Sequence, residues 1–258
     1  MTTTAISHSR KDFAMNRVLT FAATELKLFF RDPAGVLVVA ALPVGLVLVF
    51  GLSSTGAPPT GGSRSVPAFL PALGISIALG MLALFTLPSV LGAYRERGVL
   101  RRLATTPVSP AALLGAQLLV QAGIAVAATG LVATVAVLAL GLPAPANPLG
   151  LALSLLLGIA ALFSVGLLVA ALAPNAKAAG GLGPLSFFPQ MFLAGFWMPW
   201  ESMPDWLAAI GRHSPLGATL QTVVTSWMGG APAVGQLLAL GVFALVAGVT
   251  AVRLFRWV

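Results

Sequence analysis

Six long apolar runs without an ionisable residue dominate this sequence. They extend from Pro33 to Leu52, Val66 to Ala93, Pro110 to Leu140, Pro148 to Leu172, Gly180 to Pro199 and Ala233 to Val252. A helix of about 20 residues crosses a hydrocarbon core of about 30 Å, so each run is long enough to span a bilayer. Segments rich in Gly, Pro, Ser or Asn separate the runs. We therefore expect an all-α membrane protein with six transmembrane helices.

The charge content supports this expectation. Only 8% of the 258 residues are charged, whereas about a quarter are charged in an average soluble domain. So few charges cannot cover a water-exposed surface. The chain contains no cysteine, which excludes disulfides and thiolate metal sites. The net charge of +8 suits membrane orientation better than nucleic acid, because the basic residues lie in short segments between apolar runs.

The basic residues also predict the direction of the chain. Arg64 and Arg212 lie on one side of the predicted bundle, and the remaining basic residues lie on the other. That second group comprises Arg10, Lys11, Arg17, Lys27, Arg31, Arg95, Arg97, Arg101, Arg102, Lys177, Arg253 and Arg256. Cytoplasmic loops of membrane proteins are enriched in Lys and Arg. We expect a multi-pass protein of the cell inner (plasma) membrane with both termini in the cytoplasm.

The segment before the first run has an amphipathic pattern. Arg17, Lys27 and Arg31 share one helical face with Thr20 and Thr24, and large apolar residues occupy the opposite face. This pattern predicts an interfacial helix on the cytoplasmic leaflet; packing against another part of the protein is the alternative. The expected domains are a cytoplasmic N-terminus, residues 1–32, and a six-span domain, residues 33–258. The N-terminus is not expected to be a signal peptide, because about 30 polar and amphipathic residues precede a run long enough to span.

Motifs for chemistry are absent from the sequence. No lysine is followed by Ser or Thr, so there is no ATP-binding loop. His8 and His213 fall on opposite predicted sides, so we expect no metal site, and we expect no catalytic residue. The runs lack the charged groups that ion-coupled carriers use, although backbone carbonyls can still bind sodium. Transport by this chain would therefore draw energy from another subunit.

The loop after the second run carries the most specific motif. It reads Tyr94-Arg-Glu-Arg-Gly-Val-Leu-Arg-Arg-Leu-Ala-Thr-Thr-Pro-Val-Ser109. This resembles the signature of type-two ATP-binding-cassette (ABC) exporter permeases, with Val99 in place of the usual threonine and a duplicated threonine at 105 and 106. The resemblance implies a cytoplasmic coupling loop, residues 94–109, that meets an ATPase. Its implied coupling residues are Glu96, Arg97, Gly98, Leu100, Arg101, Arg102 and Leu103.

The residues of this loop are compatible with that role. Leu100 and Leu103 lie between arginines on a segment too short to cover its own apolar side, as expected of a knob for a groove on a partner. A basic anchor on anionic lipid is the alternative. Glu96 could pair with Arg101 across one turn or with a basic group on the partner.

Two further stretches carry the same resemblance. Arg31-Asp32-Pro33, with Pro43 inside the first run and Phe50-Gly51 at its end, resembles the family's opening from interfacial helix into first span. The candidate residues of this junction are Glu25, Arg31, Asp32 and Pro33. The stretches 193–199, 203–207 and 215–216 are similar to the family's last external region, which implies short re-entrant helices before the last span. The implied external gate comprises Trp197, Trp200, Glu201 and Trp206. An aromatic belt at the membrane interface is the alternative.

The fifth run combines polar and flexible apolar residues with two prolines. Its candidate substrate-pathway residues are Ser186, Phe187, Phe188, Gln190, Met191 and Phe192. Packing against lipid or within the core is the alternative for each aromatic residue.

Together these observations predict a permease subunit that exports a hydrophobic or amphiphilic molecule, such as a drug, lipid or glycolipid. The chain itself is not expected to be an enzyme or to bind a cofactor; ATP and Mg²⁺ would bind to the partner. The resemblance implies two copies of a cytoplasmic ABC ATPase and a second permease copy, expected as a homodimer, in contact with membrane lipid and without nucleic acid. A secondary transporter or channel is the first alternative, and a membrane-embedded enzyme is the second.

Overall fold

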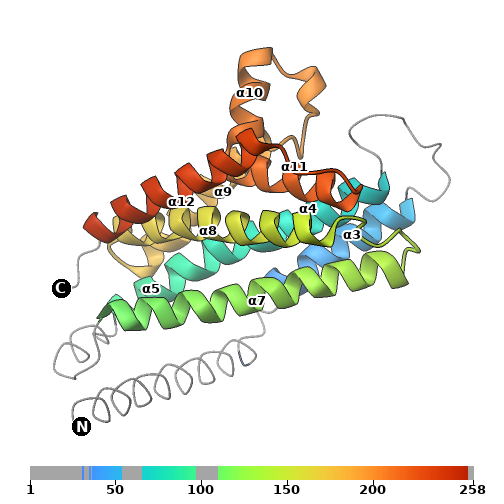
Figure 1. Ribbon diagram of the computed structural model, residues 1–258. Coiled ribbons are helices and arrows are strands. Elements are labelled where there is room, and N and C mark those ends of the chain that lie inside the picture. The colour runs from blue at the N-terminus through green and yellow to red at the C-terminus, as the bar shows by residue number, and fades with distance from the viewer. Residues whose placement is uncertain (1–30, 32–34, 36, 54–65, 97–109, 255–258) are drawn as a thin grey trace, which may run out of the picture.

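The structure, a computed structural model, describes residues 31, 35, 37–53, 66–96 and 110–254. In this part of the chain every regular element is a helix, and the long helices form an elongated bundle (Figure 1). The predicted interfacial helix lies outside the described residues except for Arg31, which is helical and exposed. Glu25, Asp32, Pro33 and the predicted coupling residues 97–103 also lie outside them.

The described helices have the following bounds. In chain order they are η1 (Leu37–Ala41), α3 (Leu42–Ser53), α4 (Val66–Met81), η2 (Leu82–Thr86), α5 (Leu87–Glu96), α7 (Pro110–Leu138), α8 (Pro148–Leu172), α9 (Ala176–Leu193), η3 (Trp200–Ser202), α10 (Asp205–His213), α11 (Pro215–Trp227) and α12 (Val234–Leu254).

Four of the described helices are long and apolar enough to cross a membrane: Ala68–Glu96, Gln117–Leu138, Pro148–Leu172 and Val234–Leu254. The apolar helix Val39–Ser53 is shorter. Helix α9 has 18 residues but includes Lys177, Gln190 and two prolines. An all-helical, multi-pass membrane architecture therefore agrees with the sequence-based prediction, whereas the structure does not establish the count of six spans.

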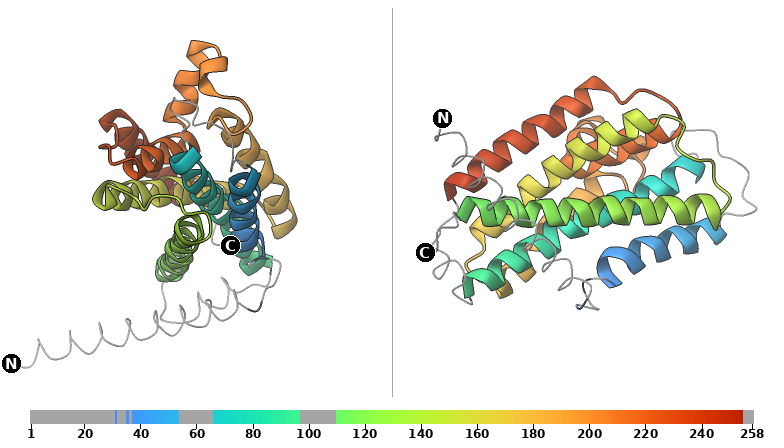
Figure 2. Two further views of the ribbon diagram at one scale, coloured as in Figure 1. Left: turned by 90° about the vertical axis from the view of Figure 1, so that its right-hand side faces the viewer. Right: turned by 60° about the horizontal axis from the view of Figure 1, so that its bottom comes forward.

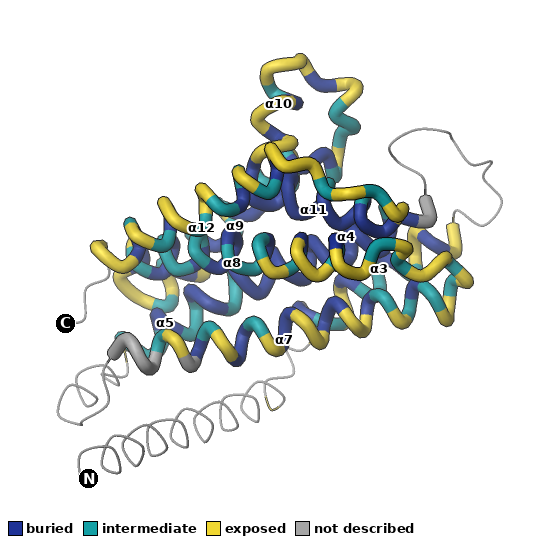
Figure 3. Tube along the Cα trace, in the orientation of Figure 1, coloured by how far each residue is buried: buried dark blue, intermediate teal, exposed yellow. Residues whose placement is uncertain are grey.

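The helix formed by α4, η2 and α5 is the centre of the bundle. In the most apolar 18-residue stretch of this helix, 89% is buried inside the protein, whereas in the corresponding stretch of α12 only 17% is buried. The view along the bundle in Figure 2 shows α4 surrounded by the other long helices. Figure 3 shows the exposed residues on the outer sides of α7, α8 and α12. Because these exposed side chains are mostly Leu and Val, the outer sides suit contact with lipid.

A proline explains the π-helical segment η2 within this central helix. Pro88 has no N–H to donate to the carbonyl of Leu84, one α-helical turn earlier. The N–H of Leu87 instead bonds to the carbonyl of Leu82, five residues back. Such a bulge widens the helix locally and is common at functional sites.

Two neighbouring helices approach this widened segment through glycines. A Cβ added to Gly166 of α8 would overlap the carbonyl oxygen of Ala83, and one added to Gly183 of α9 would overlap that of Leu84. Only glycine allows such close backbone contact. Ala83 and Leu84 therefore mark the point where α8 and α9 both pack closely against η2.

Helix α11 is the element that hydropathy did not indicate. Almost all of its residues are buried, although it contains several hydroxyl side chains. Thr219, Thr222 and Ser226 satisfy their hydroxyls by donating to carbonyls within α11 itself. Thr219 lies against Gly158, and the hydroxyl oxygens of Ser226 and Ser154 are 3.4 Å apart. These contacts place α11 along the first half of α8.

Candidate functional site

The C-terminal end of α5 contacts the turn that joins α8 to α9. The Glu96 carboxylate accepts a hydrogen bond from the N–H of Ala176 at 3.0 Å, and the Arg95 guanidinium donates to the carbonyl of Ala173. Ala173 follows the last residue of α8, and Ala176 is the first residue of α9. The C-terminal end of α5 thus forms hydrogen bonds with both ends of the turn between α8 and α9.

The local sequence explains why α9 begins there. Pro174 cannot donate within a continuing helix, and Asn175 caps the new one by accepting from the N–H of Ala178 at 2.7 Å. Gly92, one turn before Glu96, brings α5 close enough to reach this cap. A Cβ on Gly92 would lie 2.8 Å from Cα and 2.9 Å from N of Ala176.

Glu96 therefore has a partner that the sequence pattern did not indicate. The expected partners were Arg101 or a basic group on another subunit, whereas the structure gives the first backbone N–H of α9. A carboxylate at this position interacts favourably with the helix dipole. The predicted coupling residues 97–103 follow Glu96 directly in the chain and lie outside the described residues.

The predicted pathway residues divide between different faces of α9. Phe187 is buried beside Gly80, with its ring edge-to-face against Phe85 at 5.2 Å between centroids. Phe188 and Phe192 are instead 54% and 40% exposed. Of these three aromatic residues, only Phe188 and Phe192 are exposed enough to contact a molecule outside the chain.

The polar and flexible residues of the same set are partly buried. Ser186 donates to the carbonyl of Gly183 at 2.8 Å, and the Gln190 side chain donates to the carbonyl of Ser186 at 3.2 Å. Met191 packs against the main apolar core. Both hydrogen bonds lie within α9, and Met191 packs α9 against the core.

The predicted gate residues also differ in their surroundings. Trp200 donates from its indole N–H to the carbonyl of Leu193 at 2.8 Å, and the Arg212 guanidinium lies 5.8 Å from its ring centroid. Trp197 and Trp206 are about two-thirds exposed, at 67% and 66%. Trp200 thus joins α9, η3 and α10, whereas the other two tryptophans face outward, as interfacial tryptophans do.

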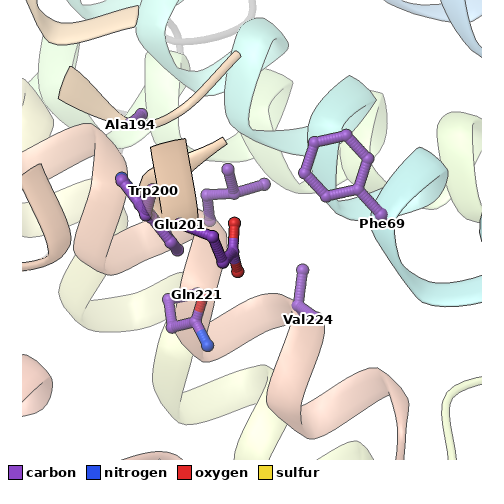
Figure 4. Close-up of a pocket in the computed structure, with 7 residues that line it drawn as sticks. Phe69, Ala194, Trp200, Glu201, Gln221 and Val224 are labelled. Carbon is purple, nitrogen blue, oxygen red and sulfur yellow. The ribbon is translucent and has the colours of Figure 1, made fainter. Parts of the chain in front are cut away.

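Glu201 lines a small pocket beside α11. Figure 4 shows its carboxylate directed between Phe69 and Gln221. The pocket is lined by Phe69, Ala194, Trp200, Glu201, Leu220, Gln221 and Val224. It combines one carboxylate and one amide with an apolar wall.

The inward face of α7 carries polar residues that the sequence analysis did not select. Gln117 and Gln121 are each 2% exposed, and within the described residues their amide oxygens have no hydrogen-bond partner. Thr129 on the same helix and Ser76 on α4 have buried hydroxyls that also lack a hydrogen-bond partner among the described residues. The sequence did contain a signal for this polar face: Gln117 and Gln121 are four residues apart in an otherwise apolar run, which puts them on the same side of a helix.

Among the described residues there is no group of three or more His, Asp or Glu side chains that could hold a metal ion. The described part of the chain combines long apolar helices, close helix packing at glycines and a polar contact between α5 and α9. These features define a multi-pass helical membrane protein.

Comparison with known families identifies the particular family. The sequence model of the ABC-2 type transporter matches residues 16–228, so the chain belongs to this family. The matched region ends one residue after α11. It is a permease domain rather than the ATPase. No curated protein was found to match the chain.

Proposed function

We propose that this chain is the membrane subunit of an ATP-driven exporter and that a separate ABC ATPase supplies the energy. The observation that carries this proposal is the ABC-2 match over residues 16–228 in a chain without an ATP-binding loop. ATP and Mg²⁺ bind to the partner, which is present in two copies. The exported molecule is hydrophobic or amphiphilic: a drug, a lipid or a glycolipid.

The proposed topology has six spans in the inner membrane. The spans are the helix ending at Ser53, the continuous helix Ala68–Glu96, and helices α7, α8, α9 and α12. Residues 1–32 form the cytoplasmic N-terminal domain and residues 33–258 the membrane domain. Both termini and the loop 94–109 lie in the cytoplasm. In support, Arg95 lies at the end of α5, Lys177 at the start of α9 and Arg253 at the end of α12. The proposed topology puts these three helix ends on the same side of the membrane, as the positive-inside rule requires.

The proposed pathway lies between two copies of the chain. One copy supplies the exposed face of α9, with Phe188 and Phe192, and its partner supplies the same face. The external gate consists of Trp197, Trp200, Glu201 and Trp206. Helices α10 and α11 form a re-entrant pair, an arrangement supported by the burial of α11, since irregular backbone at membrane depth needs protein or water around it.

Co-purification tests this proposal. The tagged chain is extracted in mild detergent, and the proteins that accompany it are identified by sequencing. We expect an ATPase that carries a Walker motif, in equal amount to the permease. Recovery of the permease alone, with substrate transport intact in liposomes without ATP, would favour a secondary transporter.

A further inference from the structure

The first turn of α9 is capped by two side chains from different parts of the chain. Asn175, next to the helix, binds the N–H of Ala178, and Glu96, at the end of α5, binds the N–H of Ala176. The first four N–H groups of a helix have no partner within it. Of these two bonds, only the one from Glu96 joins α9 to another helix.

The surrounding contacts fix the distance between α5 and α9. Gly92 lies on the same face of α5 as Glu96, one turn away, and its missing side chain lets Ala176 approach. Arg95 holds the carbonyl of Ala173 on the other side of the turn. A displacement of the end of α5 therefore acts on the start of α9 directly.

Contact between the two elements continues deeper into the bundle. Gly183 lies against the carbonyl of Leu84, and Phe187 packs on Phe85. The opposite face of α9 is exposed at Leu185, Phe188 and Phe192. Pro184 and Pro189 interrupt the hydrogen bonds of α9 and provide the positions at which it can bend.

We propose that Glu96 is a positioning residue that ties the C-terminal end of α5 to α9, so that a movement of this end of α5 displaces the first turn of α9 and with it the exposed aromatic face. This inference rests on the proposed function, in which the segment 97–109 meets the ATPase. It assigns to Glu96 a role within the permease that does not require contact with the ATPase.

The ordinary explanation is that Glu96 only stabilises a helix terminus. Asn175 provides the matched control, because N175A removes a cap from the same turn without separating α5 from α9. G92A provides a second, independent test variant, because the added Cβ forces α5 and α9 apart while Glu96 is retained. In E96Q the amide oxygen still accepts from Ala176, so the bond survives without the charge.

The experiment uses the permease–ATPase complex in lipid nanodiscs. Since the natural chain has no cysteine, a single cysteine replacing Leu185 carries a spin label that reports on the open face of α9. The label spectrum is recorded with and without ATP, and ATP hydrolysis is measured with and without a hydrophobic dye as test substrate. Size-exclusion profiles check that each variant is folded and bound to the ATPase.

We expect the ATP-dependent spectral change in the parent, in N175A and in E96Q. In E96A and G92A we expect this change and the dye-stimulated hydrolysis to fall about fivefold, within the range found for residues that couple distant sites, while basal hydrolysis persists. Equal losses in N175A and E96A, or normal coupling in both E96A and G92A, would contradict the role of Glu96. A parent chain that neither binds the ATPase nor shows an ATP-dependent spectral change would instead contradict the proposed function.

Discussion

Gly183 and Gly181 lie on the same helix but have different surroundings. A Cβ at Gly183 would overlap the carbonyl of Leu84, whereas a Cβ at Gly181 would meet nothing within 4 Å. We predict that Gly183→Ala lowers the free energy of unfolding by about 1–3 kcal/mol, the usual cost of overpacking. Gly181→Ala should be neutral or stabilising by up to about 1 kcal/mol, because Ala is the better helix former.

Thermal unfolding of the two purified variants in one detergent measures this difference. Equal melting temperatures would show that α9 does not pack closely on η2 in the folded protein.

The buried amide of Gln121 gives a second prediction at this scale. Its oxygen has no partner among the described residues, and a buried unsatisfied polar group costs about 1–3 kcal/mol. Gln121→Leu, of similar size, should therefore raise the melting temperature of the purified chain. Dye export by the complex is measured in parallel, because a polar group kept at this cost suggests a use in transport. A clear loss of stability would mean that the amide is satisfied, for instance by water.

At the scale of elements, the apolar runs predicted some helices well and missed others. The run Pro148–Leu172 coincides with α8, because Asn147 and Pro148 form a strong helix start. Helix α9 begins at Ala176 rather than Gly180, because Asn175 and Glu96 cap it. Helix α11 did not appear as an apolar run, because hydropathy counts its hydroxyl side chains as polar. Hydropathy takes no account of the hydrogen bonds within the helix that satisfy these hydroxyls.

Residues of the candidate site were predictable only in part. The importance of Glu96 followed from the loop motif, but its bond to Ala176 joins residues 80 positions apart. Likewise, the division of Phe187 and Phe188 between core and surface depends on the packing of α9 against η2. Such pairings arise from tertiary structure, and a single sequence does not encode them in any local pattern.

The segment 97–109 yields the prediction for a coupling element. We expect Leu100 and Leu103 to be buried in a pocket of the ATPase, and buried interface anchors cost about 2 kcal/mol or more when truncated. The double variant Leu100→Ala, Leu103→Ala should insert normally but weaken binding of the ATPase and substrate-stimulated hydrolysis. Pull-down and hydrolysis assays on the reconstituted complex measure both. Unchanged binding and coupling would leave the segment as a lipid anchor only.

For the whole molecule, the distribution of basic residues predicts orientation. A single cysteine replacing Ser54 should react with a membrane-impermeant reagent in intact cells, because few basic residues lie on that side. A cysteine replacing Thr105 should react only after the inner face is opened. The reverse pattern would place the termini outside and invert the proposed topology.

The account rests on one central claim: this chain moves its substrate only with ATP hydrolysed by a partner. Among the predicted spans no residue is ionisable, so no proton or sodium relay is expected within them. The most direct test is dye export by the permease–ATPase complex in liposomes, with ATP supplied and the proton and sodium gradients collapsed by ionophores. We predict that export continues under these conditions and stops when ATP is replaced by a non-hydrolysable analogue. Export that is abolished by the ionophores at constant ATP would contradict the account.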